Sequence, residues 1–106
     1  MEIRNFDSSI EEFIQSLEKQ TIAKVLHTID LLEEFGHQLG APHSKKVRGK
    51  IFELRVRGVQ EIRILYTFHK SYIVFLHGFI KKSQKTPKKE INTAFAKLRT
   101  LDRHNL

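Results

Sequence analysis

Hydrophobic residues near the start of the chain recur with the period of a helix. Their spacing is i, i+3, i+4 and i+7, which places four side chains on one face: Ile10, Phe13, Ile14 and Leu17. Ser8 precedes Glu11 by three residues, the spacing of a capping box, and this predicts where the helix starts. A short segment with apolar edges, Glu2 to Phe6, comes before it and is predicted to be a strand.

A second helical pattern follows a break at residues 18–20. Its apolar positions are Ile22, Val25, Leu26, Ile29, Leu32 and Phe35. Gly36 then stands where a helix commonly ends on a left-handed residue. Two amphipathic helices with a three-residue joint predict an αα-hairpin. Residues 36–44, which include two glycines and a proline, are predicted to be a loop.

From residue 51 onward the hydrophobic period changes to two, which is typical of β-strands. Two strands are predicted, over residues 51–57 and 61–68, with a three-residue loop that contains Gly58. This loop length pairs Arg55 with Arg63 and keeps the apolar side chains of both strands on one face. A two-residue loop would mix the two faces, so the three-residue register is preferred.

The last third of the chain predicts one more strand and a final helix. Residues 72–79 are apolar almost throughout, as in a central strand. Thr86 and Pro87 are the residue types of an N-cap and a first helical position. The helix after them has an apolar stripe of Ile91, Ala94, Phe95, Leu98 and Leu101. The pattern predicts a single α+β domain over residues 1–106, in the order β-α-α-β-β-β-α, with helices packed on a mostly antiparallel twisted sheet.

The composition excludes several classes of protein. The 106 residues suit one compact domain, and the absence of Cys excludes disulfides and thiolate metal sites. His37 and His43 lack the spacing of metal ligands, so we expect no metal and no cofactor. No apolar run approaches the ~18–20 residues of a membrane span. No basic region followed by an apolar stretch marks a signal peptide, so a cytoplasmic protein is expected.

Charge divides the chain into two parts. Residues 1–40 hold eight acidic and three basic residues, whereas residues 41–106 hold four acidic and sixteen basic ones. The whole chain has a net charge of +7 and a pI near 9.9. Such a basic segment favours a polyanionic partner, nucleic acid first and acidic protein second. A well-solvated surface without a partner is the alternative.

Arg55 and Arg63 are the first candidate for function. Like charges opposed on one sheet face cost stability, so we expect something outside the hairpin to compensate. A phosphate held between the two guanidinium groups would do so, because Arg binds phosphate oxygens bidentately. Glu53 and Glu61 supply an alternative explanation, a surface lattice of ion pairs that contributes little.

A lysine-rich segment is the second candidate. It joins a strand to a helix N-terminus, where free N–H groups favour anions, and contains Lys81, Lys82, Lys85, Lys88 and Lys89. A bound anion would relieve their repulsion, and a solvated turn is the alternative. Four more cations precede residue 51 and would widen this basic surface: Lys45, Lys46, Arg48 and Lys50.

Four segments carry a recognisable combination of residues. They are Lys46-Val47-Arg48-Gly49, Phe52-Glu53-Leu54-Arg55, Ile62-Arg63-Ile64-Leu65-Tyr66 and the run from Leu76 to Pro87, which reads LHGFIKKSQKTP. Together they resemble the RelE/ParE toxin superfamily over nearly the whole chain, and in particular its HigB-like branch, which includes phage-derived members. The resemblance implies the toxin of a type II toxin–antitoxin pair. Such a toxin is an mRNA endoribonuclease that acts on the ribosome, and a HigA-like helix-turn-helix antitoxin neutralises it in a hetero-oligomer.

Metal-free RNA cleavage uses the 2′-OH as nucleophile and needs a base, an acid and cations around the phosphorane. Arg63 and Arg55 are predicted to clamp the phosphate, with Lys82 and Lys85 adding charge stabilisation. Arg63 and Lys82 align with basic positions of RelE-like sites. Further RNA contacts are predicted for Lys81, Lys85, Lys46, Arg48 and Lys50.

The base is harder to name from the sequence. In RelE-like toxins a lysine whose pKa is lowered by neighbouring cations can serve as the base. Glu53, which stands where RelE has a catalytic lysine, and His77 are the candidates to replace it. A lone His inside an apolar strand, such as His77, is also explained as a packed core residue. The late tyrosine of RelE has no counterpart at Lys88-Lys89-Glu90.

Two other functions stay open at this point. ParE-like relatives share the fold and poison gyrase without cutting RNA, although Arg63 together with Lys82 argues against that function. A binding module would use the same basic face on RNA or on an antitoxin without turnover. Cleavage of RNA separates the first function from both of these.

Overall fold

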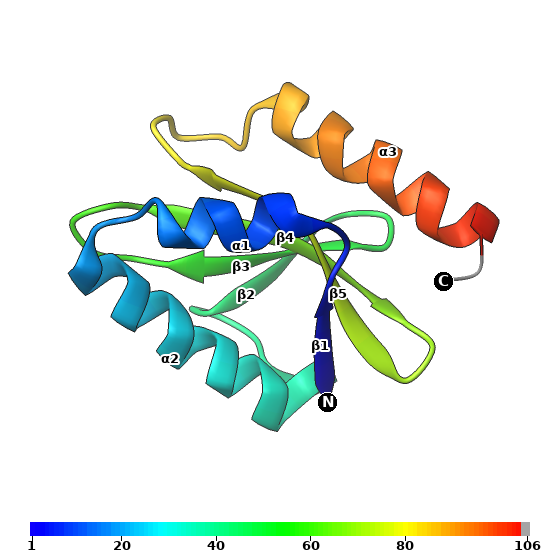
Figure 1. The fold of residues 1–106 in the computed structure, drawn as a ribbon, viewed down its shortest axis with the longest axis horizontal. Helices are drawn as coiled ribbons and strands as arrows, with labels where there is room; N and C mark the ends of the chain where they lie inside the picture. The colour runs from blue at the N-terminus through cyan, green and yellow to red at the C-terminus, as the bar shows by residue number, and fades with distance from the viewer. Residues whose placement is uncertain (105–106) are drawn as a thin grey trace.

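The structure, a computed structural model, describes residues 1–104 as three α-helices on a five-stranded sheet (Figure 1). The elements are β1 (Glu2–Asn5), α1 (Ser8–Gln15), α2 (Lys19–Phe35), the 3-10 helix η1 (Gly36–Gln38), β2 (Ser44–Arg48), β3 (Ile51–Val56), β4 (Ile62–His69), β5 (Tyr72–Ile80) and α3 (Lys88–His104). The strand order is β1-β5-β4-β3-β2, with only β1 and β5 parallel among these strands. The predicted α+β class and order are confirmed, with β2 as an additional strand.

The hairpin of β3 and β4 has the predicted register. Val56 pairs with Ile62 and Arg55 pairs with Arg63, but the connection is residues 57–61, longer than the predicted three-residue loop. The additional strand β2 lies antiparallel to β3 at the edge of the sheet and has a bulge between Lys46 and Arg48. Its sequence, SKKVR, lacks alternating apolar residues because an edge strand is largely exposed, and its lysines discourage pairing with other chains.

Two apolar layers lie on opposite faces of the sheet. Helices α1 and α2 cover one face, where the buried side chains are Ile10, Leu17, Val25, Leu32, Leu54, Val56, Ile62, Ile64, Tyr66, Ile73 and Phe75. Helix α3 covers the other face, where they are Ile51, Leu65, Tyr72, Val74, Leu76, Phe79, Ala94, Leu98 and Leu101. The apolar stripe predicted for the last helix therefore faces the sheet.

Three predicted helix boundaries need correction. The N-cap of α1 is Asp7, not Ser8, and its carboxylate accepts the backbone N–H of Ser9. The joint between the first two helices is residues 16–18, two residues earlier than expected. Helix α3 begins after Pro87, whose carbonyl accepts the N–H of Ile91, so Thr86 is not its N-cap.

Gly36 is the C-cap of α2, as predicted, and its positive φ of 50° favours glycine, although its ψ of −123° lies outside the left-handed helical region. A Cβ there would lie 2.9 Å from the sulfur of the flexible Met1 side chain, which would have to shift. Across residues 1–104, none of the helices combines the length and the apolar character needed to cross a membrane.

Candidate functional site

A buried charge network lies on the α3 face of the sheet. Glu53 of β3 and Arg63 of β4 are only 3% and 2% exposed. Glu53 Oε1 lies 3.2 Å from Arg55 Nε and 3.5 Å from Arg63 Nε. The repulsion between the paired arginines is therefore balanced inside the hairpin, by a buried carboxylate, and not in a surface lattice.

Arg63 is held from two further sides. Its guanidinium donates to the Ile62 carbonyl at 2.9 Å and to Glu61 Oε1 at 3.3 Å. Within residues 1–104, the buried Nε atoms of Arg55 and Arg63 have no acceptor in hydrogen-bonding geometry. Their interaction with Glu53 is consequently one of charge and proximity, which fixes where the two guanidinium groups lie.

The segment between β5 and α3, residues 81–87, closes over this network. At one end, the Lys81 N–H donates to the Glu61 carbonyl at 2.7 Å and extends the β4–β5 pairing. At the other end, the Thr86 hydroxyl donates to Glu53 Oε2 at 2.7 Å. The hydroxyl that the sequence assigned to a helix cap thus attaches this segment to the buried carboxylate.

Two hollows flank the segment. The larger, here called the charged hollow, has a volume of about 490 Å³ and is lined by Arg55, Arg57, Glu61, Arg63, Lys81, Lys82, Ser83 and Gln84. The adjoining hollow, of about 290 Å³, is lined by Lys45, Lys46, Val47, Glu53, Arg55, Lys81, Gln84, Lys85, Thr86 and Ile91. Each hollow has five cationic side chains against one carboxylate, so both are suited to an anion.

Lys81 contributes to both hollows and has an altered proton affinity. Partial burial lowers the pKa of its ammonium, and the nearby guanidinium of Arg63 lowers it further. Arg55 and Arg57 act in the same direction as Arg63, while the Glu53 carboxylate opposes them. Lys81 is therefore easier to deprotonate than an ordinary lysine.

Most of the residues predicted for the site come together. Arg55, Arg63, Lys81 and Lys82 line the charged hollow, whereas Lys46, Lys85 and Glu53 line the adjoining one, with Arg55 and Lys81 in both.

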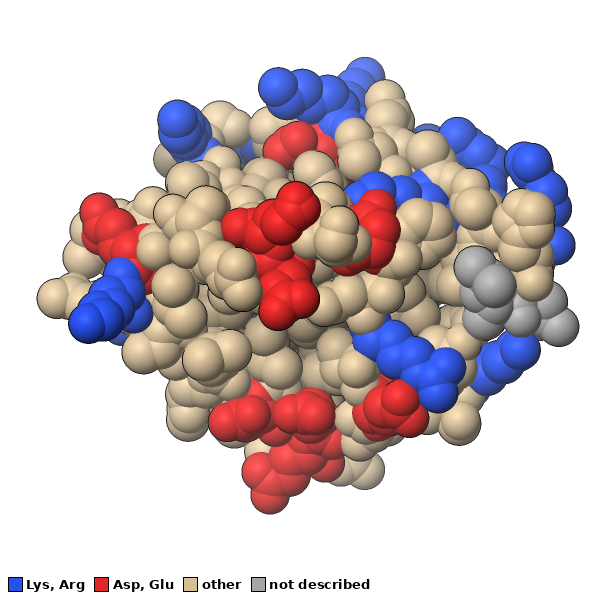
Figure 2. Space-filling view, viewed as in Figure 1, with Lys and Arg blue, Asp and Glu red and all other residues tan. Residues whose placement is uncertain are grey.

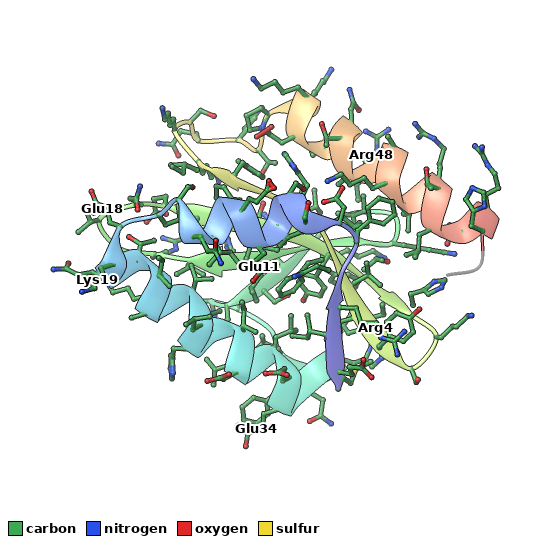
Figure 3. All side chains as sticks on the ribbon, in the orientation of Figure 1. Arg4, Glu11, Glu18, Lys19, Glu34 and Arg48 are labelled. Carbon is green, nitrogen blue, oxygen red and sulfur yellow. The ribbon has the colours of Figure 1, made fainter. Side chains whose placement is uncertain are left out.

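Three predicted residues lie outside both hollows. Arg48 places its guanidinium 5.4 Å from the centre of the Phe95 ring, beside α3 (Figure 3). Lys50 is exposed in the turn between β2 and β3. His77 Nε2 lies 3.2 Å from Glu90 Oε1, and its ring stacks on Phe79. A register shift opposite Leu65 turns His77 toward α3, so its contacts are those of a packed histidine.

Sequence reasoning missed Arg57, Gln84 and Thr86. Arg57 had a signal, because it follows Glu53 and Arg55 at the period of a strand face. Thr86 gave none, since its partner Glu53 lies 33 residues away, and Gln84 gave none, since it only lines the two hollows beside residues of β3. Among residues 1–104, no group of three or more His, Asp or Glu side chains is placed to hold a metal ion.

The surface repeats the division of charge along the chain. Figure 2 shows Lys and Arg along the upper and right-hand edges, where Figure 1 places residues 81–87 and α3, and Asp and Glu over α1 and the end of α2. Glu11 and Glu34 mark these acidic areas in Figure 3. A polyanion is therefore attracted to one side of the molecule and repelled from the other.

The family model for Phage derived protein Gp49-like (DUF891) matches residues 12–99. The chain belongs to this family. The Gp49-like family is toxin-like and related to RelE/ParE. The matched span includes every residue that lines the two hollows. A search of curated proteins finds no match to the chain.

Proposed function

We propose that this Gp49-like protein is a HigB-like toxin of a type II toxin–antitoxin pair. Its activity is cleavage of mRNA, on the ribosome in the cytoplasm. The 2′-OH attacks the adjacent phosphorus to form a 2′,3′-cyclic phosphate, and the bond from phosphorus to the 5′-oxygen of the next nucleotide breaks as that oxygen takes up a proton. The observation that carries the proposal is the convergence of Arg55, Arg57 and Lys82 on one hollow above the buried Glu53–Arg63 pair. Positive charge fixed before the reaction stabilises a phosphorane most, because no reorganisation is needed.

The cations differ in what they can touch. The Arg55 side chain is 20% exposed and Lys82 is fully on the surface, so both are free to contact the scissile phosphate. Arg63 forms the floor of the hollow and contributes its charge from below. Glu53 has both oxygens engaged, by the two arginines and by Thr86, which favours a positioning role over that of the base.

Lys81 is the group best suited to move a proton. A base that acts near neutral pH needs a lowered pKa if it is a lysine, and both burial and the neighbouring cations supply this. His77 is paired with Glu90 outside the charged hollow. We therefore assign the base to Lys81 and a packing role to His77.

The family relationship supports the proposal of an antitoxin partner. A HigA-like helix-turn-helix protein that neutralises this toxin in a hetero-oligomer is expected to place an acidic segment on the basic surface. Occlusion of the charged hollow would then account for part of the inhibition. Binding of the antitoxin that survives charge reversal at Arg55 and Arg57 would contradict this mode of inhibition.

The experiment that tests the function compares two exposed lysines. Lys82 lines the charged hollow, whereas Lys89 lies in the first turn of α3 outside both hollows. Each is replaced by Ala, and growth and mRNA 5′ ends are followed within minutes of induction in a bacterial host. Wild type and Lys89→Ala should arrest growth and create new ends inside reading frames. Lys82→Ala should cut about 100-fold more slowly, the usual cost of one stabilising charge.

Two outcomes would contradict the proposal. Growth arrest with intact mRNA would favour a gyrase inhibitor on the same fold. No arrest from folded wild-type protein would favour a binding module. A purified reaction provides the chemical check, because RNA with a 2′-deoxy sugar before the scissile phosphate should bind but not be cut.

A further inference from the structure

A third cavity, here called the side pocket, lies between α2 and the end of β3. Its volume is about 410 Å³, and it is lined by Ala23, Lys24, His27, Thr28, Pro42, His43, Arg55, Val56 and Arg57. It exists because β2 begins only at Ser44, so the last residues of β3 have no neighbouring strand on that side. The Arg55 N–H donates to the His43 carbonyl at 2.8 Å, which holds one wall of the pocket in place.

The side pocket adjoins the charged hollow. Arg55 and Arg57 are among the residues that line both cavities, so an extended ligand that contacts these residues can reach from one cavity to the other. The remaining walls differ in chemistry. The charged hollow is lined mainly by guanidinium and ammonium groups, whereas the side pocket is lined by the apolar residues Ala23, Pro42 and Val56 together with two histidines.

We propose that the side pocket binds one unstacked base of a single-stranded RNA whose phosphate lies in the charged hollow. This inference rests on the proposed function. Proteins read single-stranded RNA by splaying bases out and stacking them on aromatic, His or Arg planes. His27 and His43, which are among the lining residues, have such planar groups, and the pocket lies within the size range of ligand sites, about 300–1,000 Å³.

Charge favours the same occupant. Lys24, Arg55 and Arg57 carry positive charge at the pocket, and no acidic residue is among those that line it. A nucleotide therefore meets an excess of positive charge at both of its parts, the phosphate in the charged hollow and the base beside α2. An extended acidic peptide that pairs with the open edge of β3 is the competing occupant. Binding measurements with abasic RNA and with a peptide distinguish it from an RNA base.

The first measurement uses wild-type protein and short single-stranded RNAs made uncleavable by a 2′-deoxy sugar. One base is removed in turn at each position of the oligonucleotide. Loss of a single stacked base should weaken binding about tenfold at one position and little at the others. The affinity of the intact oligonucleotide should also fall with rising salt, because phosphate contacts supply the remaining free energy.

A matched pair of variants locates the base. Ala23→Leu fills the side pocket without changing charge, and Ala96→Leu makes the same change at an exposed position of α3 outside the cavities. Both residues are good helix formers, so equal thermal unfolding is expected. Ala23→Leu should bind the intact RNA about tenfold more weakly, as weakly as the abasic RNA, while Ala96→Leu should keep the wild-type difference.

Each other outcome overturns a distinct statement. Equal binding of intact and abasic RNA by wild type, with cleavage retained, overturns the side pocket alone. Discrimination that persists in Ala23→Leu places the base elsewhere. Wild type that neither binds nor cuts RNA overturns the proposed function. If bases are not discriminated but Ala23→Leu abolishes binding of an alternating Glu-Val peptide, the occupant is a peptide strand.

Discussion

The two faces of the sheet are built from the same strands but are closed in different ways. On the face covered by α1 and α2, Ile62 and Ile64 of β4 are fully buried among apolar side chains. On the other face, Leu65 packs against α3, but Arg63 lies where residues 81–87 replace the helix as cover. This part of the face buries charge because Glu61, the Ile62 carbonyl and Glu53 surround Arg63, and the loop adds the Thr86 hydroxyl, which donates to Glu53.

The difference in closure is also a difference in energetics. Apolar burial is non-directional, so the α1–α2 face tolerates any side chains that fill its volume. A buried ion pair contributes little by itself, and its cost appears only when one partner is removed. At the charged end of the α3 face, a substitution is therefore expected to lower stability by leaving a buried polar group without its partner. On the α1–α2 face, a substitution is expected to lower stability by changing the volume of the packed side chains.

The largest effect is expected for Arg63→Ala. Removal of this guanidinium leaves Glu53 buried beside Arg55 alone, which should lower the free energy of unfolding by about 3–5 kcal/mol. Urea unfolding measures the loss. The double variant Glu53→Leu with Arg63→Met should recover most of it, because both charges are then gone. A double variant as unstable as the single one would contradict the view that the unpaired charge causes the loss.

The next effect belongs to the opposite face. A Cβ added at Gly78 would lie 2.5 Å from the Phe13 ring of α1, so Gly78→Ala overpacks this layer and should cost about 1–3 kcal/mol. Gly40→Ala is the matched control, because nothing lies within 4 Å of its added Cβ. RNA cleavage below the unfolding temperature should be unchanged in both. Equal stability of the two variants would show that α1 shifts freely on the sheet.

A smaller effect is expected for Thr86→Val, which keeps the shape of the side chain but removes its hydroxyl. Glu53 then loses a donor, and the free energy of unfolding should fall by about 1–2 kcal/mol. Thr93→Val in α3 is the control, since the Thr93 hydroxyl only donates back to the Lys89 carbonyl. Cleavage should decline in Thr86→Val alone, because residues 81–87 are no longer held over the hollow. Identical activity of the two variants would contradict this role.

The smallest effect concerns pH. The fold lowers the pKa of Lys81, so this ammonium loses its proton, and its attraction for phosphate, at a lower pH than an ordinary lysine. Affinity for uncleavable RNA should therefore weaken as pH rises from about 7 toward 10. Lys81→Arg should remove this dependence, because a guanidinium stays charged throughout. If Lys81 is also the base, Lys81→Arg binds RNA at high pH but does not cut it.

Much of the fold was predictable, since it depends on neighbours in sequence. The pairing of Arg55 with Arg63 followed from strand alternation and loop length, and both determine the register locally. The burial of Glu53 and Arg63 was not predictable, because it depends on residues 81–87 folding back over β3 and β4. Strand β2 was not predicted for a related reason, because an exposed edge strand has no alternating apolar residues by which the sequence could reveal it.

The charged hollow and the side pocket also differ in how far the sequence could predict them. The cations of the charged hollow come from residues 55–82 and could be grouped from the hairpin and the lysine run. The side pocket joins Ala23 of α2 to Pro42 and Val56, and no spacing in the chain relates these three. Only packing of α2 across the sheet creates that cavity.

The parallel pairing of β1 with β5 has a consequence for how the chain folds. Glu2 pairs with Tyr72, so this contact closes a loop of seventy residues. The pairings of β2 with β3, β3 with β4 and β4 with β5 are hairpins, and each closes a loop of only a few residues. Non-local pairings slow folding, although each doubling of loop length costs only about 0.6 kcal/mol. We expect β2–β5 to assemble first and β1 to join last. The charged hollow, drawn from residues 55–84, would then take shape before the sheet is complete.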